Sequence, residues 1–253
     1  MFRIILALLL LLPANVFAYE CTKEIDLLSK ESKIKVSCDP SKTYSYSSNI
    51  TGTRATNDKL DIFYPYLKKF IVSYDTPFLR KHIEEIILVE NLRKNGIDIG
   101  GLSDGRKIFV CLDNYSGDLT EVYLRILHHE FSSDVFKANE YELILNWKSI
   151  SREKYNFTSE FNRRCLNNFY FAYDYNESIN SDGFIYNYGK TNEENDFNTY
   201  AETLFIRTDF MKSLKSYPKI NKKLQLFKQF YRNAGFKGKF PDETWQTAIA
   251  GLV

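Results

Sequence analysis

Between residues 118 and 136, apolar side chains recur every three or four positions, the spacing that places them on one face of an α-helix. That face contains Leu119, Val122, Tyr123, Ile126 and Leu127. Asp118, followed three residues later by Glu121, fits a capping box at the start of such a helix. The pattern therefore predicts a capped helix over residues 118–136.

Two histidines and a glutamate lie in the second half of this predicted helix. At about 100° per residue, Glu130 falls near the middle of the apolar face, and His129 and Ser133 lie at its edge. His128 points to the opposite side. A carboxylate is costly to bury without a partner, so Glu130 is the most informative candidate for a functional residue. An alternative is that Glu130 is only a buried carboxylate, satisfied by an Arg or Lys or by Tyr188.

Two further helices are predicted before this one. The first covers residues 57–73, interrupted or begun at Pro65, and the second covers residues 76–84, opened by Pro77. His82 lies in the second helix among charged neighbours, which is typical of a surface histidine.

Short β-branched runs at residues 86–89 and 107–112 predict two strands, with glycine-containing turns between them. Residues 19–56 are polar, and we expect an irregular segment there with one short strand near residues 33–37. Strands followed by capped helices predict an α+β fold.

Beyond the histidine-containing helix, an apolar stretch covers residues 140–150 and residues 158–172 have helical spacing. A basic surface helix is predicted over residues 215–233. Its packing residues are Leu224, Phe227 and Phe230.

Another capped helix is predicted, with its body over residues 196–205. Thr191 and Glu194 fit a second capping box at its start. Its apolar face contains Phe197, Ala201 and Leu204, and its other side carries Asn195, Thr199 and Glu202. This polar stripe fits either a wall of a functional site or a solvated helix face, and spacing alone favours the solvated face.

The first 18 residues have the pattern of a secretion signal. A basic start precedes an apolar run over residues 4–12, and Ala18 ends a plausible cleavage site. The run is too short to span a bilayer comfortably, and no later stretch is apolar enough to do so. We therefore expect a mature chain, residues 19–253, that is periplasmic or secreted and has no membrane span.

Composition narrows the class of protein further. The net charge of +2 gives no reason to expect a nucleic-acid partner. No linker divides the mature chain, and its 18 Tyr and 20 Phe can fill a substantial core, so one domain is predicted.

Four cysteines remain in the mature chain: Cys21, Cys38, Cys111 and Cys165. An even number in an exported chain favours disulfides, and three pairings are open. Cys21 with Cys38 closes the shortest loop, which would leave Cys111 for Cys165. The alternative is that one or both pairs remain reduced and buried.

The segment from His129 to Ser133 resembles the HExxH helix motif of zinc metallopeptidases, with serine in place of the second histidine. The segment from Tyr188 to Glu202 resembles the second metal helix of gluzincin-type zinc-binding metallopeptidases, and Phe197 stands where that pattern has a phenylalanine. The resemblance covers roughly residues 57–212. It implies a zincin-like fold, with a small sheet, the motif helix and an opposing second helix.

The resemblance also implies roles for individual residues. His129, Ser133 and Asn195 would occupy the three zinc-ligand positions, Glu130 the position of the general base, and Tyr188 that of the oxyanion partner. A hydroxyl and an amide are poor zinc ligands, so two alternatives follow from the resemblance: a zinc cofactor held by unusual ligands, or a site without metal.

Neighbouring residues do not replace the lost ligands easily. His128 faces away, and Asp196 lies about 100° from the polar stripe. Glu202 lies on the stripe but roughly 10 Å from Asn195 along the helix.

These observations predict three alternative functions. The first is a non-catalytic or metal-poor zincin-like protein that binds a peptide or protein, for instance by main-chain pairing at a sheet edge. The second is an active zinc-dependent peptidase with unusual ligands. The third is a structural envelope protein in which the motif arose by chance.

Overall fold

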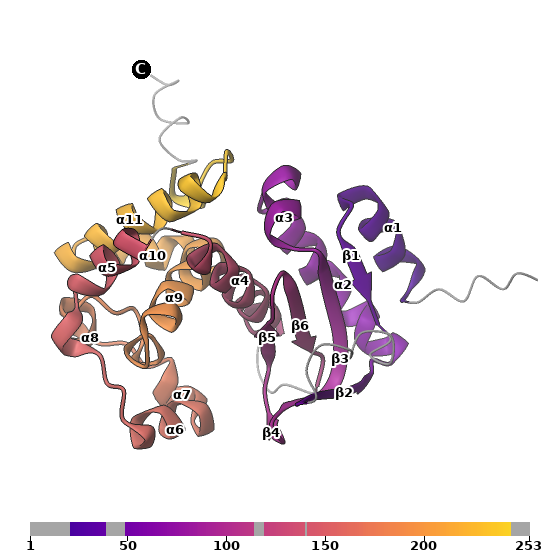
Figure 1. The fold of residues 1–253 in the computed structure, drawn as a ribbon, viewed down its shortest axis with the longest axis horizontal. Helices are drawn as coiled ribbons and strands as arrows, with labels where there is room; N and C mark the ends of the chain where they lie inside the picture. The colour runs from indigo at the N-terminus through magenta and orange to yellow at the C-terminus, as the bar shows by residue number, and fades with distance from the viewer. Residues whose placement is uncertain (1–20, 39–48, 114–118, 140, 244–253) are drawn as a thin grey trace, which may run out of the picture.

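The computed structural model describes residues 21–38, 49–113, 119–139 and 141–243. The predicted signal segment and the Asp118 cap lie outside these residues. Within them, no helix has both the length and the apolar character needed to cross a membrane. Figure 1 shows the sheet and the N-terminal helices on the right and most later helices on the left, which we call the sheet half and the helical half.

One small mixed sheet forms the centre of the sheet half. Its main path runs β1 (Lys35–Ser37), β3 (Glu85–Lys94), β6 (Lys107–Cys111) and β5 (Gly101–Ser103). β1 and β6 are parallel to β3, whereas β5 is antiparallel to β6 and ends the path. β2 (Ile50–Arg54) and β4 (Ile97–Asp98) extend the far end of β3.

Both predicted strands are present, and the first is longer than predicted. β3 begins with five consecutive buried residues, as expected of a central strand covered on both faces. The segment between the two strands was expected to be a turn region, and it contains β4 and β5.

Three helices belong to the sheet half: α1 (Lys23–Ser32), α2 (Asn57–Val72) and α3 (Thr76–His82). The expectation of an irregular segment over residues 19–56 is wrong for α1 and β2, although β1 lies at the predicted strand. α2 runs through Pro65 because that residue is on its exposed side, where water can satisfy the freed carbonyl. α3 has Pro77 in its first turn, as predicted.

His82 is not a surface residue. Its side chain is buried, and a ring nitrogen lies 3.2 Å from the Ala234 carbonyl oxygen. The charged neighbours in the sequence face outward, and the histidine closes a contact with the end of α11.

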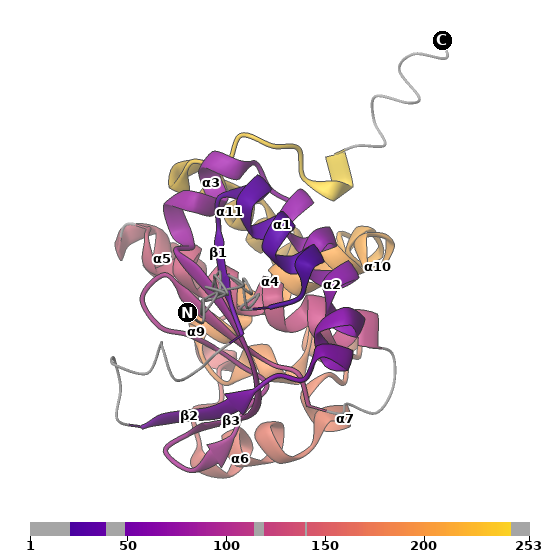
Figure 2. The same ribbon diagram turned by 90° about the vertical axis from the view of Figure 1, so that its right-hand side faces the viewer.

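α4 (Leu119–Lys137) is the predicted histidine-containing helix, and Figure 1 shows it between the two halves. Figure 2 shows the sheet half from the front, with the helical half behind it. Both of its sides are covered. His128 is buried on the side opposite the predicted apolar face, where its Nδ1 lies 2.7 Å from the Tyr74 hydroxyl and its ring stacks on Phe205.

The helical half wraps the other side of α4. Its helices are α5 (Tyr141–Ser149), α6 (Ser159–Asn167), α7 (Phe169–Ala172), α8 (Glu177–Ser181), α9 (Glu193–Ile206), α10 (Thr208–Leu214) and α11 (Pro218–Ala234). Short 3₁₀ turns η3 (Arg152–Lys154), η4 (Asn187–Lys190) and η5 (Pro241–Glu243) lie among them. The predicted packing residues of α11 are all buried.

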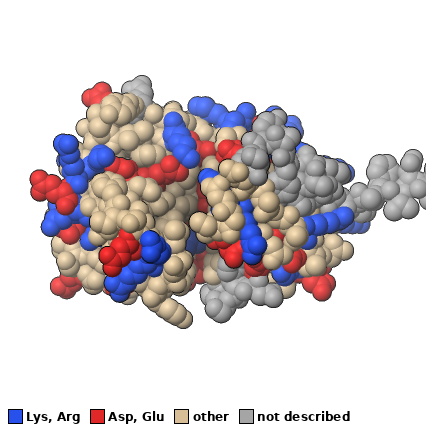
Figure 3. Space-filling model, turned by 60° about the horizontal axis from the view of Figure 1, so that its bottom comes forward, with Lys and Arg blue, Asp and Glu red and all other residues tan. Residues whose placement is uncertain are grey.

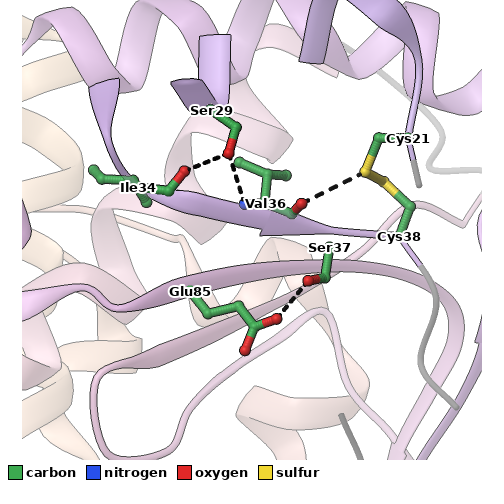
Figure 4. Close-up of a disulfide and its surroundings, with 7 residues drawn as sticks. All are labelled: Cys21, Ser29, Ile34, Val36, Ser37, Cys38 and Glu85. Carbon is green, nitrogen blue, oxygen red and sulfur yellow. Dashed lines mark hydrogen bonds between the residues drawn. A yellow bond between two sulfur atoms is a disulfide. The ribbon is translucent and has the colours of Figure 1, made fainter. Parts of the chain in front are cut away.

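The predicted Cys21–Cys38 disulfide is present and links the start of α1 to the end of β1 (Figure 4). For the second pair the alternative holds, because Cys111 and Cys165 are both buried thiols and form no disulfide. Cys111 belongs to β6 and packs beside Phe109 in the sheet half, whereas Cys165 belongs to α6 in the helical half.

Candidate functional site

The seam between α4 and α9 contains the residues that the sequence singled out. α9 packs against α4, α5 and α11, and every residue from Asp196 to Phe205 is buried. Thr199 and Glu202 of the predicted polar stripe are therefore inside the protein, and the solvated interpretation is wrong for both. The stripe contributes to a buried polar seam.

His129 of α4 contacts Glu202 of α9 across this seam. Its Nδ1 lies 2.6 Å from Oε1 of Glu202, and the other oxygen of Glu202 lies 3.4 Å from Nε of Arg125. Burial lowers the pKa of His129, but the hydrogen bond to Glu202 and the Glu130 charge outweigh it, so the pKa is raised. The imidazole is thus held by a carboxylate.

Arg125 backs this contact from within α4. Its guanidinium lies 3.8 Å from the centre of the Tyr173 ring, over the ring face, and also pairs with Glu121 one turn earlier. Sequence reasoning missed Arg125 and Tyr173. The spacing of Glu121, Arg125 and His129 at four-residue intervals was the signal that could have identified the arginine.

Ser133, at the position of the second zinc-binding histidine, is engaged inside the seam. Its hydroxyl accepts a hydrogen bond of 2.8 Å from Nδ2 of Asn198, while Ser132 donates to the oxygen of the same amide. All three side chains are buried. Asn198 therefore joins two consecutive serines of α4 to α9, and the serine hydroxyl is directed toward α9.

Asn195, at the position of the third ligand, is engaged elsewhere. Its amide donates a 2.8 Å hydrogen bond to the Thr191 hydroxyl. The predicted Thr191–Glu194 capping box is wrong, because Asn192 caps α9 by accepting the backbone N–H of Asn195 at 2.7 Å. Thr191 instead donates to the Tyr188 carbonyl.

Glu130 lies against the edge strand β5. A Cβ placed on Gly101 would be only 2.9 Å from Oε1 of Glu130, so this glycine allows the close approach of α4. Desolvation raises the pKa of Glu130 to about 6, although the His129 charge opposes the shift. One turn later, Asp134 accepts a 2.8 Å hydrogen bond from the Ser103 hydroxyl and so ties β5 to α4.

Tyr188 faces the same region from η4. Its ring centre is 5.7 Å from that of His129 and 6.0 Å from that of Tyr173. Burial raises the pKa of Tyr188, and the Glu130 charge raises it further, so the hydroxyl stays protonated. The structure therefore brings together His129, Glu130 and Tyr188, but it directs Ser133 and Asn195 into other contacts.

Asp196, considered as a substitute ligand, points away from this region. Its carboxylate is buried against Lys223 of α11 and against Trp147. His128 is likewise engaged by Tyr74 on the opposite side of α4. Of the three possible substitutes, only Glu202 contacts His129.

The site opens between the two halves. In Figure 1, β5 and β4 face α7 and α6 across the underside of α4, and Figure 3 shows a furrow there with acidic atoms along it. The edge of the sheet thus forms one wall of the furrow, and the helical half forms the other.

These residues do not fit a zinc ion. Zinc sites in proteins use imidazole, thiolate or carboxylate donors in groups of three or four. Among the described residues, no three His, Cys, Asp or Glu side chains are grouped so that they could hold a metal ion. The hydroxyl and amide at the two changed positions are already hydrogen-bonded within the protein.

Comparison with known proteins supports the architecture. A crystal structure from Bacteroides caccae, titled as that of a "putative zinc-binding metallo-peptidase", superposes with a TM-score of 0.55 at 18% sequence identity, covering 90% of each chain. The chain has a metallopeptidase-like fold. No protein-family model and no curated protein matches the sequence. At this identity the likeness bears on the fold alone, and the function has to be argued from the site.

Proposed function

We propose that this protein is exported and zincin-like, and that it binds an extended peptide or protein segment in the furrow without a catalytic metal. The observation that carries the proposal is the engagement of Ser133 by Asn198 and of Asn195 by Thr191. Both residues stand at ligand positions of the zinc-peptidase pattern, and both serve internal packing. The general base position, Glu130, then has no metal-bound water to activate.

The β5 edge supports peptide binding. Asp104 and Lys107 exchange two backbone hydrogen bonds at the β5–β6 turn, and Cys111 donates to the Gly100 carbonyl. Backbone groups alternate in direction along an antiparallel pair, so those of Gly101 and Ser103 point away from β6, and the Ser103 backbone hydrogen-bonds to Glu130. Among the described strands, β5 pairs only with β6. A ligand strand could therefore extend the sheet beside Glu130.

The furrow offers side-chain contacts as well. Tyr188 and Tyr173 belong to the wall formed by the helical half, and their rings are in contact. Phe169 packs on Tyr173, with its ring centre 4.8 Å from that of Tyr173. Phe169 and its neighbour Tyr170 are both exposed. Aromatic rings next to an open strand edge suit an extended peptide, whose backbone and side chains need different partners.

An active zinc peptidase is the second candidate, and one observation favours it. Metal-binding histidines usually donate their other ring N–H to a carboxylate, which is the relation of His129 to Glu202. Glu130 and Tyr188, at the positions of the base and the oxyanion partner in the zinc-peptidase pattern, both lie beside the same histidine.

Metal counting combined with peptide binding tests both candidates. The mature chain, made in an oxidising compartment without a His-tag, would be analysed for zinc beside His129→Ala, then titrated with a fluorescein-labelled random decapeptide pool. We expect no zinc above the blank, together with peptide binding that survives Glu130→Gln. One zinc per chain that is lost in His129→Ala, with turnover abolished by Glu130→Gln, would establish the peptidase instead. Neither zinc nor peptide binding would leave a structural envelope protein.

A further inference from the structure

A second charged pair lies behind the site, in the interior of the helical half. Nζ of Lys223 on α11 is 2.6 Å from Oδ2 of Asp196 on α9, and both side chains are 0% exposed. The same ammonium donates a 3.0 Å hydrogen bond to the Gly183 carbonyl. The peptide-binding proposal does not use this pair, and no described residue of the furrow hydrogen-bonds to it.

Aromatic side chains enclose the pair. Nζ of Lys223 lies 4.3 Å from the centre of the Phe184 ring, with Trp147 and Tyr155 also within 6 Å. The indole N–H of Trp147 donates to Oδ2 of Asp196 at 2.9 Å, and the Tyr155 hydroxyl does so at 2.7 Å. The other oxygen, Oδ1, is buried and has no hydrogen-bond partner.

Such an environment disfavours charge. Desolvation raises the pKa of Asp196 and lowers that of Lys223, although the attraction between the two opposes both shifts. Moving one proton along the short hydrogen bond converts the ion pair into a carboxylic acid and a free amine. A desolvated lysine amine is a competent nucleophile, and the 2.6 Å hydrogen bond places it beside the Asp196 carboxyl group.

We propose that Lys223 and Asp196 condense to an intramolecular amide that links α11 to α9 covalently. After the proton transfer, the lone pair of Nζ attacks Cγ and forms the N–C bond. The Cγ–Oδ2 bond breaks, and Oδ2 departs with its own proton and with one from Nζ, relayed by the Tyr155 hydroxyl. One water is released, Oδ1 remains as the amide carbonyl oxygen, and no oxidant or cofactor is needed.

The position of the pair explains what the link would do. The Cys21–Cys38 disulfide fastens only the sheet half, and Cys111 and Cys165 form no disulfide. An amide between residues 196 and 223 would fasten the helical half in the same way. It would hold the start of α9, the helix that carries Glu202, against α11.

Intact mass spectrometry tests the amide directly. The purified mature chain, reduced and denatured, is expected to weigh one water less than its sequence, about 18 Da. Lys223→Met and Asp196→Ala should each show the full mass of their sequences. Lys228→Met is the matched control, because Lys228 pairs with Asp242 at 2.9 Å but is partly exposed, and this variant should keep the deficit.

Peptide mapping distinguishes this amide from other reactions that release one water. A succinimide at an Asp-Gly bond gives the same mass change but no branched peptide. Tryptic digestion should yield one branched species that joins the peptide containing Asp196 to that containing Lys223. A wild-type chain of full mass, or a deficit that persists in Lys223→Met, would overturn the proposal. Both readings are taken on denatured protein, so a variant that folds poorly still gives an answer.

Discussion

Two buried charged networks share α9, and they differ in what surrounds them. Glu202 holds His129 and Arg125 at the furrow, where the His129 side chain keeps 13% of its surface exposed. Asp196 holds Lys223 behind aromatic rings, where neither side chain is exposed. Asp196 and Glu202 are six positions apart on the same helix. The network of Glu202 is accessible to solvent and can exchange protons with it, whereas the network of Asp196 is not. Exposure, more than charge, separates a candidate site from a structural clamp.

Removing one partner of the sealed network should have the largest effect. Lys223→Ala removes the proposed amide and leaves the Asp196 carboxylate buried without a cation, and the uncompensated charge alone costs about 3–5 kcal/mol. Urea unfolding should show the midpoint falling sharply. The double variant Lys223→Met with Asp196→Leu should recover the part of the loss that comes from the buried charge, but not the part that comes from losing the amide. A double variant as unstable as the single one would contradict this account.

Breaking the open network should cost less. Glu202→Gln removes the negative charge beside His129 and Arg125, and we expect a loss of about 2–3 kcal/mol, because Arg125 retains Glu121. The pKa of His129 should fall, since its hydrogen bond to Glu202 is the main factor that raises it. NMR titration of the His129 ring protons measures this. An unchanged pKa would mean that Glu202 does not hold the imidazole.

Gly101→Ala perturbs the contact between the furrow's strand and α4. The added Cβ would meet Cγ2 of Ile126 at 2.6 Å, so we expect a loss of about 2 kcal/mol from overpacking. Ile126→Ala in the same chain removes the nearest clashing group and leaves only the contact with the Glu130 side chain at 2.9 Å. The double variant should therefore be more stable than the sum of the single effects predicts, as thermal unfolding of the four proteins would reveal. Additive effects would place the strain elsewhere.

The smallest predicted effect is a pH dependence from Glu130. Its folded-state pKa, about 6, lies above the ordinary value of 4.5. The unfolded chain therefore releases this proton first, and stability should fall as the pH rises from about 4.5 to 6, by about 1 kcal/mol. Glu130→Gln should remove that part of the slope in urea unfolding at several pH values. An identical slope in both proteins would assign the dependence to other groups.

Helical periodicity predicted the two helices that form the seam, but not the side-chain contacts within it. The spacing around Tyr123 and Phe197 locates α4 and α9 correctly, because a 3.6-residue repeat is a local property of the sequence. β5 has only three residues, too few for an alternating pattern, and its pairing depends on β6. The short loop between Cys21 and Cys38 was also sufficient to predict one disulfide.

Other features depend on long-range packing. Nothing beside Lys223 in the sequence indicates a buried lysine, since its partner Asp196 lies 27 positions earlier. Thr191 and Asn192 both suit a helix cap, and the contacts of Thr191 with Tyr188 and Asn195 decide between them. The spacing of residues along the sequence does not reveal which of these tertiary contacts forms.

The Cys21–Cys38 disulfide also governs how the protein withstands reducing conditions. β1 is three residues long and covers one side of β3 at Glu85–Ile87. Without the covalent link at its end, so short a strand can detach together with α1 and uncover unpaired backbone groups. The uncovered part of β3 is buried and, apart from Glu85, apolar, which favours self-association. Reduction would then lower the solubility of the chain more than it lowers the stability of the rest of the fold.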